Sequence, residues 1–319
     1  MRRLFTLAFL FLFSSGAFAA EDTIRRGFRV GDGGTLKLDA RIGSVTIVTG
    51  GTGVAVEVVR RATGMMADEA LRDHEIAFEQ RGDDVIITSK HDHGLRQWFS
   101  SYRVKWNIRV PARYNVDVRT SGGGIDLAGI GGTVDARTSG GSIRTGRLGG
   151  PATLRTSGGS ITVAGASAGL QARTSGGSIE IGDTTGTVEA RTSGGSIRLA
   201  RVGGEVAAHT SGGGIRIEDA LGRVDATTSG GSIHARLSRQ PSGDSRLSTS
   251  GGGITLSVAR DVKLDLDARA SGGGVRSDVP VTITVHGSVD RHSLRGQING
   301  GGPKLVLRTS GGGIRLSQM

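Results

Sequence analysis

The 319-residue chain has no cysteine, five prolines and few aromatic residues. Without cysteine the protein can form no disulfide and can carry no lipid on an N-terminal cysteine, so its fold must hold without covalent cross-links. No aromatic residue follows Tyr114, so residues 115–319 must pack without aromatic rings. No apolar run after Phe13 approaches the roughly 18 residues of a membrane helix, and no transmembrane segment is expected after the N-terminus.

The N-terminus has the three parts of a secretory signal peptide. Residues 1–3 are basic at two positions, residues 4–13 are almost entirely apolar, and small residues surround Phe18 before Glu21. The ten residues of the apolar run are too few to cross a bilayer, which favours removal of residues 1–20 over retention as an uncleaved anchor. We therefore expect the mature protein to be extracytoplasmic, whether periplasmic, secreted or held at the cell surface.

The chain is basic, with 40 Lys and Arg against 29 Asp and Glu and a net charge of +11. Loss of Arg2 and Arg3 with the signal leaves 38 basic against 29 acidic residues, a net charge of +9. This surplus favours anionic polysaccharide or another envelope or extracellular polymer as a partner. Specific recognition of nucleic acid is not expected.

A short motif, clearest as Arg-Thr-Ser-Gly-Gly-Ser-Ile at residues 137–143, returns throughout the rest of the chain. A fixed period near 20 residues is typical of a stacked array, in which each unit buries its apolar edge against its neighbours. The 56 glycines would indicate disorder if they had no period, but most of them lie at these repeats. The motif serine stands at Ser121, Ser139, Ser157, Ser175, Ser193, Ser211 and Ser229, 18 residues apart, and then at Ser250, Ser271 and Ser310.

Apolar residues alternate with polar ones on both sides of each Gly-Gly pair, as at Val134 and Ala136 before it and Ile161 and Val163 after it. This alternation predicts two short strands joined by a corner, where glycine would supply backbone angles that a side chain disfavours. We predict an all-β fold, a single-stranded, parallel, right-handed β-helix or β-solenoid with about 18 residues per coil. The repeated Thr-Ser pair is expected to form a hydrogen-bonded ladder at the corner.

Residues 21–111 lack the motif and are expected to form degenerate β coils and a cap. A cap is needed because the first coil would otherwise leave its backbone edge open. The pattern predicts one short helix at residues 66–75 and, among the strands, residues 84–89 and 103–110. Residues 112–319 would form the regular array with a C-terminal cap that includes the excursion at residues 278–293.

One outward column of the array is rich in arginine two residues before the motif serine. Stacked about 5 Å apart, these arginines repel one another unless something neutralises them. Either acidic residues two positions further back balance them, as Asp135 would, or they form a basic stripe that binds a polyanion. The candidate binding residues in this column are Arg119, Arg137, Arg155, Arg173 and Arg191.

A second candidate site is an aromatic cluster beside basic residues, a composition that suits sugar rings, lipid interfaces or stacked bases. The alternative is that these rings close the end of the stack. The cluster consists of Trp98, Phe99, Tyr102 and Trp106.

No catalytic constellation is visible, because outward acids are scattered and no nucleophile elbow is present. His91 and His93 could supply two metal ligands, but no third is identifiable, so neither a metal nor a cofactor is expected. The protein is predicted not to be an enzyme.

Several sequence features together resemble a known family. They are Phe28 and Val30, residues 43–45, residues 108–111, the Thr-Ser-Gly-Gly repeats, residues 299–302 and residues 308–314. They resemble the bacterial "putative adhesin" domain family of unknown function, whose members are secreted or membrane-tethered Gly-rich solenoids. The resemblance implies the solenoid fold and an extracytoplasmic location, but it transfers no catalytic residue and no ligand.

These observations predict a non-enzymatic adhesin-like or scaffold protein that presents a repetitive, mildly basic surface to a polymer. Two alternatives remain open. One is a polysaccharide-modifying enzyme whose site lies near the aromatic cluster. The other is a regulatory partner of envelope proteins in an envelope stress response.

Overall fold

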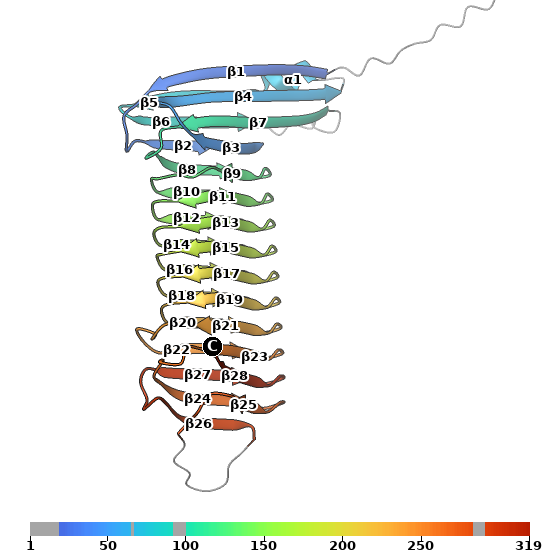
Figure 1. Ribbon diagram of the computed structural model, residues 1–319. Coiled ribbons are helices and arrows are strands. Elements are labelled where there is room, and N and C mark those ends of the chain that lie inside the picture. The colour runs from blue at the N-terminus through green and yellow to red at the C-terminus, as the bar shows by residue number, and fades with distance from the viewer. Residues whose placement is uncertain (1–18, 65–66, 92–99, 283–290) are drawn as a thin grey trace, which may run out of the picture.

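The computed structural model describes residues 19–64, 67–91, 100–282 and 291–319. In these residues 28 strands form two 14-stranded sheets, here called sheet A and sheet B, and there is one short helix. The sheets face each other along a rod, and each coil of the array contributes one strand to each sheet (Figure 1). This arrangement confirms the all-β solenoid, whereas its handedness stays a prediction.

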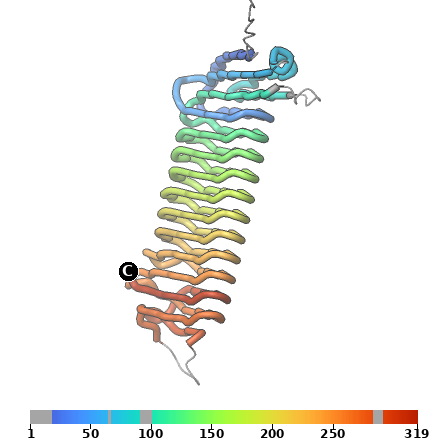
Figure 2. The backbone as a smooth tube through the Cα atoms, turned by 90° about the vertical axis from the view of Figure 1, so that its right-hand side faces the viewer, coloured from blue at the N-terminus to red at the C-terminus, as the bar shows by residue number. Residues whose placement is uncertain are grey.

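The regular array runs from β8 to β23, with even-numbered strands in sheet B and odd-numbered strands in sheet A. Figure 2 shows its coils as a stack of evenly spaced turns. The sheet B strands are β8 (Asn115–Thr120), β10 (Val134–Thr138), β12 (Ala152–Arg155), β14 (Leu170–Arg173), β16 (Val188–Arg191), β18 (Val206–His209), β20 (Val224–Thr228) and β22 (Ser245–Thr249). The sheet A strands are β9 (Ile125–Leu127), β11 (Ile143–Leu148), β13 (Ile161–Ala166), β15 (Ile179–Thr184), β17 (Ile197–Val202), β19 (Ile215–Ala220), β21 (Ile233–Leu237) and β23 (Ile254–Val258).

Like residues stack on one another inside the rod. Ile143 pairs with Ile161 and Ile161 with Ile179, and none of the three is more than 1% exposed. Burial of each isoleucine contributes about 1.5–3 kcal/mol, so the stack is stabilised coil by coil. The shaft between the sheets is narrow enough for aliphatic side chains to fill it, which explains why the array needs no aromatic residue.

The motif threonine points inward and the motif serine outward, as the alternation predicts. The hydroxyl of Thr138 donates a 2.8 Å hydrogen bond to the carbonyl oxygen of Gly123 in the preceding coil. It also accepts one of 3.3 Å from the backbone N–H of Gly141 in its own corner. The same pair of bonds recurs at Thr156, so the predicted corner ladder is confirmed.

The reason for the corner glycines differs from the prediction. Within the described residues, the array corners contain no glycine with a left-handed backbone; Gly33 and Gly300 are examples elsewhere. Instead, a Cβ atom at Gly141 would overlap the carbonyl oxygen of Gly123 in the preceding coil. A Cβ at Gly140 would lie 3.5 Å from the nearest atom, an ordinary contact. The second glycine is therefore required by close stacking and not by backbone angle.

The N-terminal end combines two coils with reversed strands, and both sheets continue from it into the array without a break. The coil β2–β3 stacks parallel on β8–β9, and β6 and β7 stack parallel on its other side. In contrast, β4 runs antiparallel to its neighbours β1 and β7 in sheet A, and β5 runs antiparallel to β6 in sheet B. The elements are β1 (Ala19–Arg29), β2 (Thr35–Asp39), β3 (Ser44–Thr49), β4 (Gly53–Gly64), α1 (Ala67–Arg72), β5 (His74–Arg81), β6 (Asp84–His91) and β7 (Ser100–Val110).

The predicted helix is present but shorter than residues 66–75. It ends at Arg72, because His74 begins β5, where it packs between the sheets and is 2% exposed. The proposed domain boundaries, at residues 20 and 111, stay predictions.

The last coil of the chain is inserted between two earlier ones. In sheet B, β27 pairs parallel with both β22 and β24, and in sheet A, β28 pairs parallel with both β23 and β25. The register keeps like positions together, since Thr309 lies beside Thr249 and Ile314 beside Ile254. The copy at Ser310, the last in the sequence, therefore lies between the copies at Ser250 and Ser271 in the stack (Figure 1). These strands are β24 (Leu264–Ala270), β25 (Val275–Ser277), β26 (Ser293–Ile298), β27 (Lys304–Thr309) and β28 (Ile314–Gln318).

The chain enters this inserted coil through a sharp turn. Asn299, Gly300 and Gly301 all have a left-handed backbone, with φ of 50°, 86° and 84°. The Asn299 side chain donates 2.8 Å hydrogen bonds to the carbonyl oxygens of Arg260 and Val262. The segment is therefore a reversal between antiparallel β26 and parallel β27, and it differs from the array corners it resembles in sequence.

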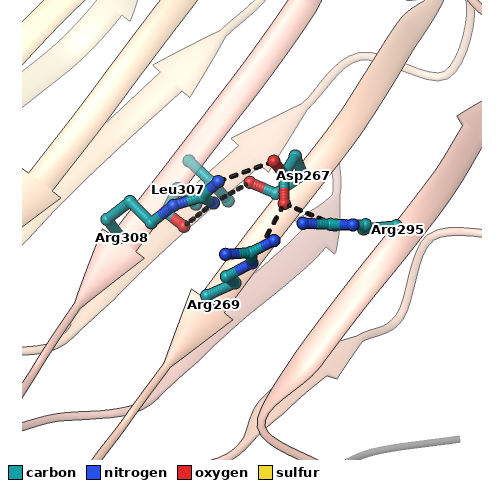
Figure 3. Close-up of polar contacts among 5 residues, drawn as sticks. All are labelled: Asp267, Arg269, Arg295, Leu307 and Arg308. Carbon is teal, nitrogen blue, oxygen red and sulfur yellow. Dashed lines mark hydrogen bonds and ion pairs between the residues drawn. The ribbon is translucent and has the colours of Figure 1, made fainter.

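Asp267 holds the inserted coil to its neighbours (Figure 3). Arg308 of β27 donates a 2.6 Å hydrogen bond to its carboxylate, and Arg295 of β26 donates one of 3.2 Å. Burial by itself would raise the pKa of Asp267, but the hydrogen bonds and charges of Arg308 and Arg295 hold that pKa below its ordinary value. The stability that this carboxylate contributes is present above its ordinary pKa and is lost only as pH falls through the lowered value.

Candidate functional site

The structure brings the five candidate arginines of the array together on the outer face of sheet B. Arg137 lies beside Arg119 on one side and Arg155 on the other, and the ladder continues through Arg173 to Arg191. Beyond Arg191 the column continues as uncharged or weakly basic side chains, because His209 and Thr227 occupy the next two coils.

Four of these arginines are paired with acidic residues, which supports the balanced charge ladder. Arg137 contacts Asp135 at 2.6 Å, and Arg119 contacts Asp117 at 3.5 Å. Arg173 and Arg191 share Glu189, at 2.7 and 2.8 Å.

Of these acids, Glu189 is the one that contacts two arginines of the ladder. The hydrogen bond from Arg173 lowers the pKa of Glu189, and the charges of Arg173, Arg191 and His209 add to this effect, while burial opposes it. Glu189 therefore remains ionised near neutral pH, and its ion pairs with the two arginines persist. Each such exposed pair contributes about 0–1 kcal/mol to stability, so its main consequence is to neutralise the surface.

Arg155 differs from the other four. The residue two positions before Arg155 is Thr153, and the residue beside Thr153 on β14 is Gln171. Neither of these two positions therefore offers an acid to Arg155. Among the described residues no carboxylate lies within 4.0 Å of its guanidinium. Arg155 thus leaves one unneutralised positive charge near the middle of the ladder.

A groove of about 780 Å³ runs beside the arginines along the rod. Its lining comes from eight successive sheet B strands, from Thr35 of β2 to Asp225 of β20. Seven steps of about 4.8 Å give it a length of about 34 Å. Its lining includes the outward column of Asp135, Thr153 and Gln171, and also Thr133, Pro151 and Thr187. The alternation predicts that these columns point outward, but it does not predict the groove.

The aromatic candidates are placed differently from the arginines. Trp106 is fully buried, and its indole N–H donates a 3.1 Å hydrogen bond to the carbonyl oxygen of Ile42. Tyr102 is half-buried, with its hydroxyl 2.6 Å from Nδ1 of His74, and burial raises the pKa of Tyr102 to about 12. Trp98 and Phe99 lie outside the described residues. Trp106 and Tyr102 therefore fit the alternative in which aromatic rings close the end of the stack.

The described residues contain no group of three or more His, Asp or Glu side chains arranged to hold a metal ion. In the same residues, no helix has the length and apolar character to span a membrane. The chemistry that the outer face of sheet B offers is hydrogen bonding and ion pairing, repeated from coil to coil.

Two facing parallel sheets built from 18-residue coils define a β-solenoid repeat protein. The chain belongs to the Toastrack DUF4097 family, whose sequence profile matches residues 36–317. This match confirms the family resemblance seen in the sequence. A search of curated protein sequences gave no match.

Several solved structures are similar to this chain. One is a "putative adhesin" from Bacteroides fragilis, with 11% identity and a TM-score of 0.42, covering 93% of this chain and 97% of that one. A "putative lipid binding protein" from Parabacteroides distasonis has 11% identity, a TM-score of 0.41 and the same coverage. A "putative adhesin" from the same species has 12% identity, a TM-score of 0.35 and again the same coverage. None of the three is named as an enzyme.

Proposed function

We propose that this protein is a non-enzymatic, extracytoplasmic binding or scaffold rod that holds a linear polymer of the cell envelope or its surroundings. The observation that carries the proposal is the groove along sheet B, which spans eight strands and is lined by repeating side-chain columns. A linear polymer that lies along the rod meets an equivalent set of side chains at every step of about 4.8 Å. This step is close to the length of one sugar unit in an extended polysaccharide.

The chemistry of the groove favours a ligand that forms many hydrogen bonds over one with a dense single charge. The arginines of one side are largely neutralised by Asp117, Asp135 and Glu189, which themselves line the groove. The centre carries the uncharged Thr153 and Gln171 beside the unpaired Arg155. Binding in the groove should therefore depend only weakly on salt.

Replacing Thr153 with leucine tests the groove directly. We expect about a tenfold loss of affinity for a polysaccharide that binds there, because the change removes a hydroxyl partner and adds an apolar branch to the lining. Binding is measured against a panel of neutral and charged envelope and plant polysaccharides, by calorimetry or affinity electrophoresis. Release of reducing ends from the same panel is measured in parallel, and hydrolysis by the pure protein would contradict the non-enzymatic assignment.

The matched control is Thr162→Leu, which makes the same change in the same coil but on the exposed outer face of sheet A. This variant should bind as the unaltered protein does. Equal losses in both variants, or no binding by the unaltered protein to any polysaccharide of the panel, would argue against the groove as the binding site.

A further inference from the structure

The outer face of β7 carries a row of positive charges at the N-terminal end of the rod. Because side chains of a strand alternate, Val104, Trp106 and Ile108 point into the core. The residues that alternate with them, at positions 103, 105, 107 and 109, point outward and are exposed. This basic row consists of Arg103, Lys105 and Arg109. Six residue steps along the strand separate its ends, a distance of about 20 Å.

The basic row has no ion-pair partner in the described part of the chain. Among the described residues, no carboxylate lies within 4.0 Å of any of its three cations. Two acids on β1 and β4 have other partners, since Glu57 pairs with Arg25 at 2.8 Å and Glu21 pairs with Arg61. The hydrogen bonds that Arg25 and Asn107 donate lower the pKa of Glu57, so it remains ionised in these contacts. This is the opposite of the arginine ladder of sheet B.

A hollow of about 590 Å³ adjoins Arg109 on the same face. The β-sheet register places Ala55 of β4 next to Arg109, and Gly27 of β1 next to Ala55. These small residues leave space, and no atom lies within 4 Å of where a Cβ of Gly27 would be. On the other side of Arg109, Val48 of β3 is 39% exposed. The hollow is therefore lined by small and apolar residues beside Arg109. Its polar lining includes Thr46, Asn107 and the ion-paired Arg25 and Glu57.

We propose that this face is a second binding site, which takes an anionic polysaccharide. The basic row pairs with carboxylate or sulfate groups of the polymer, and the hollow beside Arg109 seats one of its sugar rings on the small residues of β1 and β4. A linear polymer suits this geometry because the charges lie in a line and because the hollow has a shape that a planar lipid surface would not use. The site is separate from the groove of sheet B and does not depend on it.

The test removes the charges of the basic row together, as Arg103→Gln/Lys105→Gln/Arg109→Gln. The probes are polygalacturonate for carboxylate and dextran sulfate for sulfate, with neutral dextran as the uncharged comparison. The variant should lose at least about tenfold in affinity for one or both anionic probes, since each exposed charge contact contributes up to about fivefold. The slope of log Kd against log salt concentration should fall by about 2, because three contacts no longer release counterions.

The matched control is Arg137→Gln/Arg173→Gln/Arg191→Gln, which removes the same charge from ion-paired positions of the ladder. The affinity of this variant for the anionic probes should change less than threefold. The Thr153→Leu variant should bind the anionic probes as the unaltered protein does. Both triple variants replace exposed or half-exposed side chains, and equal melting curves by circular dichroism establish that they fold. An equal or larger loss in the ladder variant would overturn the proposal. So would failure of the unaltered protein to bind either anionic probe. A parallel assay with acidic phospholipid vesicles would also overturn it if the triple variant lost binding to the vesicles only.

Discussion

Replacing Gly141 with alanine should lower the free energy of unfolding by about 3 kcal/mol, a large effect for the addition of one methyl group. The new Cβ would overlap the carbonyl oxygen of Gly123 in the preceding coil. This overlap is with backbone, which cannot rotate away as a side chain could. Neighbouring coils hold one another in register, so relief at one corner requires displacement of the next. Urea unfolding followed by circular dichroism measures the change.

Gly140→Ala is the matched control for this prediction. It makes the same chemical change one residue earlier, where the added Cβ meets its nearest atom at 3.5 Å. We expect its unfolding midpoint to lie close to that of the unaltered protein, because both glycines lack the left-handed backbone that alanine resists. If the two variants were equally destabilised, backbone conformation and not close stacking would explain the corner glycines.

Deleting one whole coil should leave a folded protein. Removal of residues 157–174 joins Thr156 to Ser175 and takes out 18 residues, so every later residue keeps its sheet and its inward or outward direction. The rod should shorten by one step of about 4.8 Å and keep cooperative unfolding, since contacts in a solenoid are made between nearest neighbours. Small-angle scattering and circular dichroism report length and fold.

Deleting half a coil should destroy the fold in that region. Removal of residues 157–165 takes away nine residues, including most of β13, and leaves β12 without its sheet A partner strand in the same coil. The isoleucine ladder from Ile143 to Ile179 would then be interrupted, and the protein should aggregate or unfold at a much lower urea concentration. Similar stability of the two deletion variants would contradict a stack with an 18-residue period.

The array itself was predictable because its sequence repeats a physical requirement. Ile143, Ile161 and Ile179 recur at one spacing, and residues that recur in this way stack when coils lie over each other. The inward threonine was predictable for the same reason. The role of Gly141 was not predictable, because a repeated glycine is equally consistent with an unusual backbone angle and with close approach of the preceding coil.

The order of the coils near the ends could not be predicted from the repeat. The motif at Ser310 resembles the copies at both Ser250 and Ser271, so its sequence does not say which copies are neighbours. Insertion gives β27 and β28 two paired edges each. It also brings Arg308 beside Asp267, a contact between residues 41 apart in the chain.

Candidate binding residues were predictable to different degrees. The arginine ladder followed from spacing, and the alternatives of a balanced or a basic column were both visible, but the geometry of Arg137 and Arg173 was needed to see the ion pairs. Trp106 looked like part of a surface cluster because aromatic residues gather near it in sequence. In the structure the alternation of β7 directs it inward, and directs Arg103 and Lys105 outward, a pattern that the sequence of the strand already contains.

The fold requires like positions to stack in register whatever their order along the chain. Paired cysteines test it cleanly, because the protein has no cysteine of its own. In the structure Thr255 lies beside Arg315, while Arg276 lies one strand further on. Neighbouring strands place Cα atoms about 4.8 Å apart, within the range of a disulfide, and the next strand is about twice as far.

The measurement compares oxidative cross-linking in the folded Thr255→Cys/Arg315→Cys and Thr255→Cys/Arg276→Cys variants. The inserted coil predicts a disulfide in the first variant and free thiols in the second. A disulfide in the second variant and none in the first would mean that the coils follow chain order, and would contradict the account.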